Sequence, residues 1–393
     1  MPNKGAVMGV LHQLIIDSVS PDELRAQRVE VMRRIRKKTG RHVLILAADP
    51  TKPAPFGPGS MLHTEDVPFF EELLSSTPRD ADADVVVHSS GGLAEAAEQL
   101  SRMAKAHFRE VRFVVPTLAQ SAATILALSG HRLMMGPYAS LGPIDPQFVQ
   151  PNGTTVPAQA LTEGVKKILG TSRKGRLNPG YIPMLQRVSP ADLQAAQDAT
   201  MLSTRLVTDS LTTGMLAGRA DAEATASATA EALCSHARWL SHGRLITADQ
   251  LRELGLPVEE YSDDGVAEDY NELSSLLVVT MLSNIIKLYE TETVDMAKRL
   301  NLVSPPGILP DPRAANNANI DLECAKCHGK IPLQLRFADD VQLEPGRVPF
   351  PDSGKLKCPH CNADMDVKGV RQQLETQLHK KAVKWPTQEE SAS

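Results

Sequence analysis

Residues 85–92 read VVVHSSGG, and residues 116–124 read PTLAQSAAT. The first stretch is typical of a buried strand that ends in two glycines, and the second places a serine just before a helix-like run. Gly91 and Gly92 carry no side chain that could cover their backbone N–H groups. Ser121 would lie where the unpaired N–H groups and the dipole of a helix favour negative charge. Together the stretches indicate a serine nucleophile beside an oxyanion hole.

Acyl transfer to water needs an activated nucleophile and two preorganised N–H donors for the oxyanion. We assign the nucleophile to Ser121 and the two donors to the backbone N–H groups of Gly91 and Ala122. Taken singly, a serine that opens a helix is most often an N-cap, and Ser-Gly-Gly after a strand is most often a turn. Their occurrence together, in this order, favours a serine hydrolase, with a peptidase as the leading activity.

The sequence around these stretches predicts alternating strands and helices joined by short links. Most of the strands are continuous apolar runs, as expected for a mainly parallel sheet that is covered on both faces. Ser20 and Glu23 form the pattern of a capping box. The Arg- and Lys-rich helix that follows is read as a solvated face or a subunit contact, with nucleic-acid binding as the alternative. The expected helices are 21–38, 64–74, 93–105 and 122–128, and the expected strands are 43–47, 84–87, 111–115 and 132–135.

The length of 393 residues allows two or three domains. An apolar helix over 274–287 is a candidate subunit contact, with burial in the core as the alternative. We expect an N-terminal helical segment over 1–40, a catalytic core over 41–157, a helical extension over 158–303, a linker over 304–320, a zinc ribbon over 321–369 and a polar tail over 370–393.

Composition excludes several classes of protein. Aromatic residues make up only 4%, which argues against a stacking surface for single-stranded nucleic acid. The N-terminus lacks the basic and apolar regions of a signal peptide, and the longest apolar stretch, 274–286, is too short to span a bilayer. We therefore expect a cytoplasmic protein without a membrane span. In that compartment, closely spaced cysteine pairs indicate metal binding rather than disulfides.

From His42 to Phe148 the chain resembles the Clp-protease/crotonase superfamily. Within it the chain is most similar to the signal peptide peptidase A-like serine peptidases, and specifically to the serine dehydrogenase proteinase family. A weaker similarity continues through 242–244 and 254–258. The resemblance implies an α/β, Clp/crotonase-like core in which Gly91, Gly92 and Ser121 form the oxyanion hole and the nucleophile. It also implies a peptide or protein substrate and a homo-oligomer, either a tetramer or a ring.

The general base does not follow from the sequence. Relatives use a histidine or a lysine downstream of the serine, yet no histidine lies between His131 and His236. Our best candidate is Lys166, which would need a pKa lowered by burial. The other candidates are Lys167, Lys174, Asp145 and His88. Each also has a purely structural interpretation: Lys167 as a solvated charge, Lys174 as a loop residue, Asp145 as part of a turn and His88 as a hydrogen-bonded histidine at a strand end. The chain also has Ala123 where relatives usually carry glycine.

Two Cys-x-x-Cys motifs lie near the C-terminus, with 30 residues between them. Two such turns supply four thiolates, which complete a tetrahedral structural site for Zn²⁺ and leave no open position for catalysis. The lysines and the arginine around the motifs are compatible with a partner protein or a nucleic acid. Cys234 is left over and is expected to be a buried, inert thiol. The metal ligands are Cys324, Cys327, Cys358 and Cys361.

Two alternatives to the peptidase remain open. Without a base, the core could grip peptides without cleaving them. A crotonase-like enzyme could use the same oxyanion hole on an acyl thioester without a serine nucleophile. Labelling of Ser121 by a fluorophosphonate separates the peptidase from both alternatives.

Overall fold

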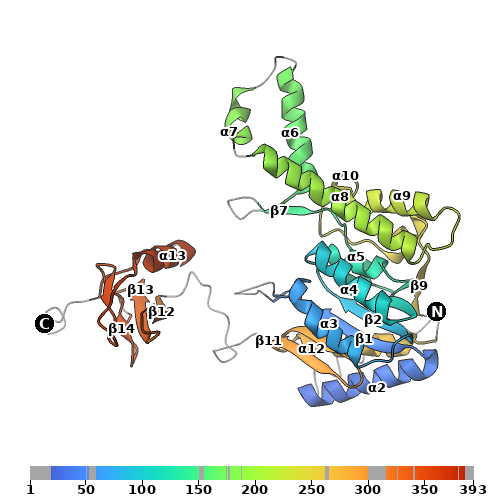
Figure 1. Cartoon of the computed structure of the whole chain (residues 1–393), viewed down its shortest axis with the longest axis horizontal. Helices are drawn as coiled ribbons and strands as arrows, with labels where there is room; N and C mark the ends of the chain where they lie inside the picture. The colour runs from blue at the N-terminus through green and yellow to red at the C-terminus, as the bar shows by residue number, and fades with distance from the viewer. Residues whose placement is uncertain are drawn as a thin grey trace. The chain divides into compact units, whose positions relative to one another are not determined.

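The computed structural model of the chain (Figure 1) divides into two compact units, 1–302 and 303–393. Each unit is described by itself. The structure describes residues 19–385, with gaps at 50, 53–58, 150–154, 174, 176–177, 187, 262–264, 300–315, 325, 340 and 379.

A seven-stranded sheet forms the centre of the first unit, in the order β11-β10-β1-β2-β3-β5-β9. The five strands from β1 to β9 pair in parallel, and β10 and β11 add an antiparallel edge. This mixed, parallel-rich sheet confirms the predicted α/β class. The strands are β1 His42–Ala48, β2 Asp82–His88, β3 Glu110–Val115, β5 Arg132–Met135, β9 Val258–Glu260, β10 Ile285–Glu290 and β11 Asp295–Arg299.

Helices cover both faces of this sheet (Figure 1), as the apolar strands require. Successive side chains of a strand point to opposite faces of the sheet. In β2, Val86 accordingly packs in the core cluster on one face and Val87 in the cluster on the other. One face is covered by α2 Pro21–Thr39 and α12 Ala267–Met281, and the other by α3 Val67–Ser75, α4 Ala94–His107, α5 Ala122–Leu128, α8 Pro190–Thr213 and α9 Ala222–Cys234.

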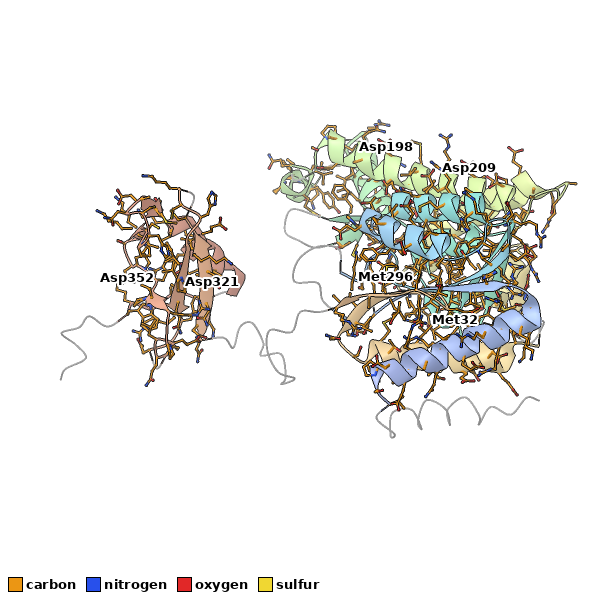
Figure 2. The ribbon with its side chains drawn as sticks, turned by 60° about the horizontal axis from the view of Figure 1, so that its bottom comes forward. Met32, Asp198, Asp209, Met296, Asp321 and Asp352 are labelled. Atoms are coloured by element: carbon orange, nitrogen blue, oxygen red, sulfur yellow. The ribbon has the colours of Figure 1, made fainter. Side chains whose placement is uncertain are left out.

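The basic helix α2 has the capping box expected from its sequence, with Ser20 and Glu23 bonded reciprocally. Met32, labelled in Figure 2, is fully buried on the side of the helix that packs against the sheet. The cationic side chains meet carboxylates of α12, β10 and their loops, for example Arg34 Nε with Asp269 at 2.9 Å. Further pairs are Arg28–Glu290, Lys38–Asp269 and Arg36–Glu292. Several of the positive charges of α2 are thus paired with carboxylates of the same unit.

Short strand pairs surround the end of the sheet where the parallel strands finish. β4 Leu118–Ala119 pairs in parallel with β6 Ser140–Leu141, and β7 Gln147–Val149 pairs antiparallel with β8 Thr155–Pro157. An isolated bridge also joins Ser89, just after β2, to Ala119. These contacts align the residues before Ser121 with the end of β2.

An arm of helices extends above the sheet (Figure 1) and leads into α8, the helix on which Asp198 and Asp209 are labelled in Figure 2. It starts with α6 Ala158–Arg173, and a short stretch holding η2 Pro179–Tyr181 and α7 Ile182–Leu185 links α6 to α8. The short helices α10 His236–Trp239 and α11 Ala248–Glu253 follow α9.

Two predicted elements need correction. The predicted apolar helix over 274–287 ends at Met281, and Ile285–Glu290 forms strand β10 instead. Its Ile, Leu and Tyr side chains favour a strand, and pairing with β1 buries most of them. The helix predicted from residue 64 begins as a 3-10 turn, Thr64–Asp66, whose cap is His63 rather than Thr64. Three strands of the sheet therefore come from the segment that we expected to be helical.

The described part of the second unit is a small β structure with the helix α13. Its core includes Ile331, Leu333, Leu335 and Phe350, and two cysteines are buried among them. Most of the predicted linker lies outside the described residues, and β12 already begins at Asn317. The elements are β12 Asn317–Glu323, β13 Lys330–Arg336, β14 Val348–Pro349, β15 Lys355–Lys357, β16 Asp364–Asp366 and α13 Lys368–Leu378.

Candidate active site

The two glycines after β2 lie in tight backbone contact with their surroundings. Gly91 has a φ of +100°, and a Cβ at this position would lie 2.5 Å from Gln120 O and 2.8 Å from Ser121 Cβ. The segment before α3 pairs with this turn, because Leu62 N–H donates to Gly91 O at 2.7 Å. Gly92 has a φ of +153° and approaches the backbone of Leu62. Glycine is needed at residue 91 for both conformation and space.

Ser121 has an unusual backbone for a serine that precedes a helix. Its φ is +51° and its ψ is −121°, and its side chain makes no capping hydrogen bond. A positive φ costs an L-residue of this kind about 1–2 kcal/mol, and such strain tends to cluster at functional sites. Among the described residues, Ser121 Oγ has no hydrogen-bond partner. The geometry therefore departs from that of an ordinary N-cap.

The two expected oxyanion donors differ in their present partners. In the described part of the chain, the N–H of Ala122 has no acceptor, as is usual in the first turn of a helix. The N–H of Gly91 donates to Ser89 Oγ at 3.1 Å. An oxyanion is the stronger acceptor, since charge-assisted hydrogen bonds are roughly twice as strong as neutral ones. The Ala122 donor is thus available, whereas the Gly91 donor would have to exchange its partner.

The lysine candidates lie on α6 or beyond it. Lys166 is 62% exposed and bonds to Glu163 at 2.8 Å. It lines a groove of about 650 Å³ between α6 and α8. Lys167 is also exposed, and Lys174 lies outside the described residues. Because Lys166 is exposed and paired with Glu163, its role as the base stays a prediction.

His88 lies at the end of β2, on the side of the sheet that faces α12. It borders a cavity of about 240 Å³ together with Thr117 and Leu277. Its Nδ1 is hydrogen bonded to Thr117 Oγ1. Burial lowers the pKa of His88 below its ordinary value. Because α5 packs on the opposite face of the sheet, this histidine is better explained as a structural residue.

Asp145 is the centre of a polar cluster that our sequence reading did not find. It is 1% exposed and contacts His242 Nδ1 at 2.6 Å and His236 Nδ1 at 3.2 Å. Gln147 Nε2 also donates to Asp145 Oδ2 at 3.0 Å. We considered Asp145 a turn or a candidate base, but its histidine partners lie more than 90 residues later in the chain. The sequence signals at this place were a pair of histidines six residues apart and the weaker family similarity over 242–244.

The four cysteines of the second unit converge. Their Sγ atoms all lie within 4.8 Å of one another, and two pairs lie 3.7 Å apart. Both motifs have the same turn: His328 N–H donates to Cys324 O at 2.8 Å, and Asn362 N–H donates to Cys358 O at 2.9 Å. A tetrahedral Zn²⁺ with Zn–S bonds of about 2.3 Å needs thiolates about 3.8 Å apart. The cluster fits a metal ion of this kind.

Cys234 belongs to the first unit, where it ends α9 and is buried. Burial raises the pKa of its thiol to about 11. The thiol is therefore protonated and unreactive near neutral pH, in agreement with the expectation of an inert cysteine.

Residues 7–170 match the sequence model of a family described as ClpP-like SDH-type serine proteinases. This segment contains both glycines, Ser121 and Lys166, and ends before His236 and His242. The match supports a serine peptidase and a ClpP-like arrangement of the parallel-rich sheet. It does not identify which residues are catalytic.

Two uncharacterised proteins of Methanocaldococcus jannaschii are similar in sequence. One is 29% identical over 147 residues, which is 37% of this chain and 50% of the relative. The other is 36% identical over 83 residues, which is 20% of this chain and 28% of the relative. The chain thus spans half or less of the length of the curated relatives that it matches.

The solved structures that align with the chain include two mutants of a membrane-bound stomatin-specific protease, one in complex with a substrate peptide. The peptide complex is 14% identical, with a TM-score of 0.31, and covers 51% of this chain and 70% of its own. The second is 12% identical, with a TM-score of 0.34, and covers 53% and 79%. Within the described residues of our chain, no helix is both long and apolar enough to cross a membrane.

Proposed function

We propose that the chain is a serine peptidase that hydrolyses peptide bonds through an acyl-enzyme on Ser121. One observation carries the proposal most directly. Ser121 is held at positive φ at the start of α5, without a capping bond, and its Cβ lies directly against Gly91. A serine that only capped the helix would have no need of this strain. The family match over residues 7–170 supports the same activity.

In this mechanism Ser121 Oγ attacks the scissile carbonyl carbon. The oxyanion that forms is stabilised by the N–H of Ala122 and by the N–H of Gly91, which exchanges Ser89 Oγ for the stronger acceptor. The N-terminal end of α5 adds the favourable field of its dipole, although the helix is short. Gly92 keeps the backbone close to Leu62, whose segment flanks the turn. Lys166 stays our sequence-based candidate for the proton acceptor.

Hydrolysis of fluorescently labelled casein by the full-length protein tests the proposal. We expect turnover by the wild type and loss of turnover in Ser121→Ala, with an unchanged circular dichroism spectrum. Equal turnover by both proteins would contradict a Ser121 nucleophile. Peptide binding without cleavage would favour a binding module, and hydrolysis of acyl thioesters that survives Ser121→Ala would favour a crotonase-like enzyme.

We also propose that Cys324, Cys327, Cys358 and Cys361 hold a structural Zn²⁺. The spacing of their sulfur atoms supports this ligand set, which leaves no open coordination position. When bound, the ion ties the two turns of the second unit together and adds to its folding free energy. A cytoplasmic location, a tetramer or ring, and a protein or nucleic-acid partner of the zinc ribbon remain predictions from the sequence.

A further inference from the structure

Lys287 in β10 is a buried lysine that the proposed mechanism does not use. Its side chain is 1% exposed, and the carboxylate of Asp66 that it contacts is 0% exposed. Lys287 Nζ lies 2.7 and 2.8 Å from the two carboxylate oxygens of Asp66 and donates to Met61 O at 2.5 Å. An ammonium group has three donors, so all of its hydrogen bonds are directed at the segment 61–66.

Stability alone is a poor explanation for this buried ion pair. Taking two charges out of water costs free energy, and a well-packed apolar pair of similar volume is often as stable or more stable. Such a pair does fix positions, because a partner that moves away leaves a buried charge without its hydrogen bonds. We therefore asked which part of the fold Lys287 and Asp66 hold in place.

Asp66 binds the segment before α3 to strand β10. Its Oδ2 accepts from the N–H of His63 at 2.9 Å, and its Oδ1 accepts from Tyr289 Oη at 2.5 Å. Tyr289 also stacks on Phe69 of α3, with ring centroids 4.8 Å apart. Together with Lys287, these contacts give the segment before α3 a fixed place against the sheet.

One peptide group connects Lys287 to the turn of the proposed oxyanion hole. The C=O of Met61 and the N–H of Leu62 belong to the same planar unit. The C=O accepts from Lys287 Nζ, and the N–H donates to Gly91 O at 2.7 Å. Leu93 N–H closes the pairing by donating to Leu62 O at 2.9 Å. A cation on the carbonyl oxygen polarises the same peptide group, which strengthens the bond from its N–H to Gly91.

We propose that Lys287 and Asp66 are positioning residues of the oxyanion hole, which act on Gly91 through the peptide group between residues 61 and 62. The inference rests on the proposed acyl-enzyme mechanism. In that mechanism the N–H of Gly91 exchanges Ser89 Oγ for the oxyanion. The carbonyl of Gly91 keeps its bond to the fixed peptide group during this exchange, so the protein rather than solvent sets the new direction of the donor.

The test is the labelling of the full-length protein by a fluorophosphonate, resolved into the maximal rate, kinact, and the concentration for half of that rate, KI. Lys287→Met/Asp66→Asn removes both charges, keeps similar side-chain volumes and retains an acceptor for the N–H of His63. An interaction made only in the transition state changes kinact and leaves KI unchanged. We expect kinact to fall by about 10- to 100-fold, because a misplaced donor loses part of the factor of about 10²–10³ that a missing donor costs.

Arg28→Met/Glu290→Gln is the matched control. Glu290 lies in the same strand, its side chain is also 0% exposed, and its cationic partners Arg25 and Arg28 lie on α2. This variant removes a buried ion pair on the opposite face of the sheet. It should unfold at a lower urea concentration and keep the wild-type kinact, which separates positioning from a general loss of stability.

Native-state hydrogen exchange reads the same device without activity. The amides of Leu62 and Leu93 should exchange at least about tenfold faster in Lys287→Met/Asp66→Asn and at the wild-type rate in the control. Unchanged kinact in the folded variant, a change confined to KI, or unchanged exchange at Leu62 would each overturn the proposal. If the double variant does not fold, Lys287→Arg replaces it, because a guanidinium cannot reproduce the three bonds of the compact ammonium.

Failure of the proposed function gives a different result. If Ser121→Ala is labelled as fast as the wild type, Ser121 is not the nucleophile, and the peptidase mechanism fails. Exchange at Leu62 then still decides whether Lys287 holds the turn at Gly91. If labelling depends on Ser121 but not on the buried pair, the peptidase stands, and Lys287 and Asp66 have no positioning role in it.

Discussion

Replacement of Gly91 by alanine tests the geometry of the proposed oxyanion hole. At φ +100° the alanine costs about 1–2 kcal/mol of backbone strain. Its Cβ would also lie 2.5 Å from Gln120 O and 2.8 Å from Ser121 Cβ, so the turn must separate from the start of α5. A misplaced oxyanion donor costs about 3 kcal/mol of transition-state stabilisation. We therefore expect a loss of about 10²-fold in activity and of about 1–3 kcal/mol in stability.

Gly218→Ala is the matched control. Gly218 has a similar φ of +81°, but nothing lies within 4 Å of its Cβ position. This variant should lose about 1–2 kcal/mol of stability and keep wild-type activity. Urea unfolding followed by circular dichroism measures the stability, and fluorophosphonate labelling measures the activity. If Gly91→Ala labels as fast as Gly218→Ala, Gly91 does not shape the site and the reasoning is refuted.

Four further predictions follow from the same structure. Ser121→Gly should be about 1 kcal/mol more stable than Ser121→Ala in urea, because glycine relieves the positive φ; equal stabilities would argue against strain. Asp84→Leu should lose about 3–5 kcal/mol, because Asp84 and Arg112 are a fully buried ion pair, 2.7 Å apart; a loss below 1 kcal/mol in the same assay would contradict that account. Burial lowers the pKa of His88, so the contribution of the neutral ring to stability is present above about pH 6.5 and is lost as the pH falls. His88→Gln should therefore flatten the pH dependence of the urea midpoint between about pH 5 and 7. An unchanged slope would count against this explanation. A strong chelator should render residues 316–385 protease-sensitive while residues 19–299 stay resistant; protection of both would weigh against a metal-dependent unit.

The sequence predicts much of the core because its elements are set by local patterns. The apolar runs at 43–47 and 111–115 and the capping box at Ser20 all appear in the structure. The strand at Ile285–Glu290 was missed because its apolar run follows α12 almost directly, and only pairing with β1 decides the conformation. Local propensity cannot reveal a partner more than 200 residues away.

Part of the candidate site could likewise be predicted from the sequence, and part could not. Gly91 and Ser121 could be singled out because each lies at the end of a recognisable element. The contact of Asp145 with His242 could not, since it depends on the packing of two segments that lie more than 90 residues apart in sequence. A search for the base limited to residues near Asp145 led to Lys166, which the structure places on an exposed helix face. Clustered polar residues from separate loops need coordinates to be found.

The central claim is that Ser121 is a nucleophile. Trypsin cuts after Arg112 and Arg132, so the peptide 113–132 contains Ser121 and one other serine, Ser129. After reaction of the full-length protein with a fluorophosphonate, fragment mass spectra of this peptide identify the modified atom. We predict one adduct per chain, on Ser121 alone. An adduct elsewhere, or none on a folded protein, would contradict the account.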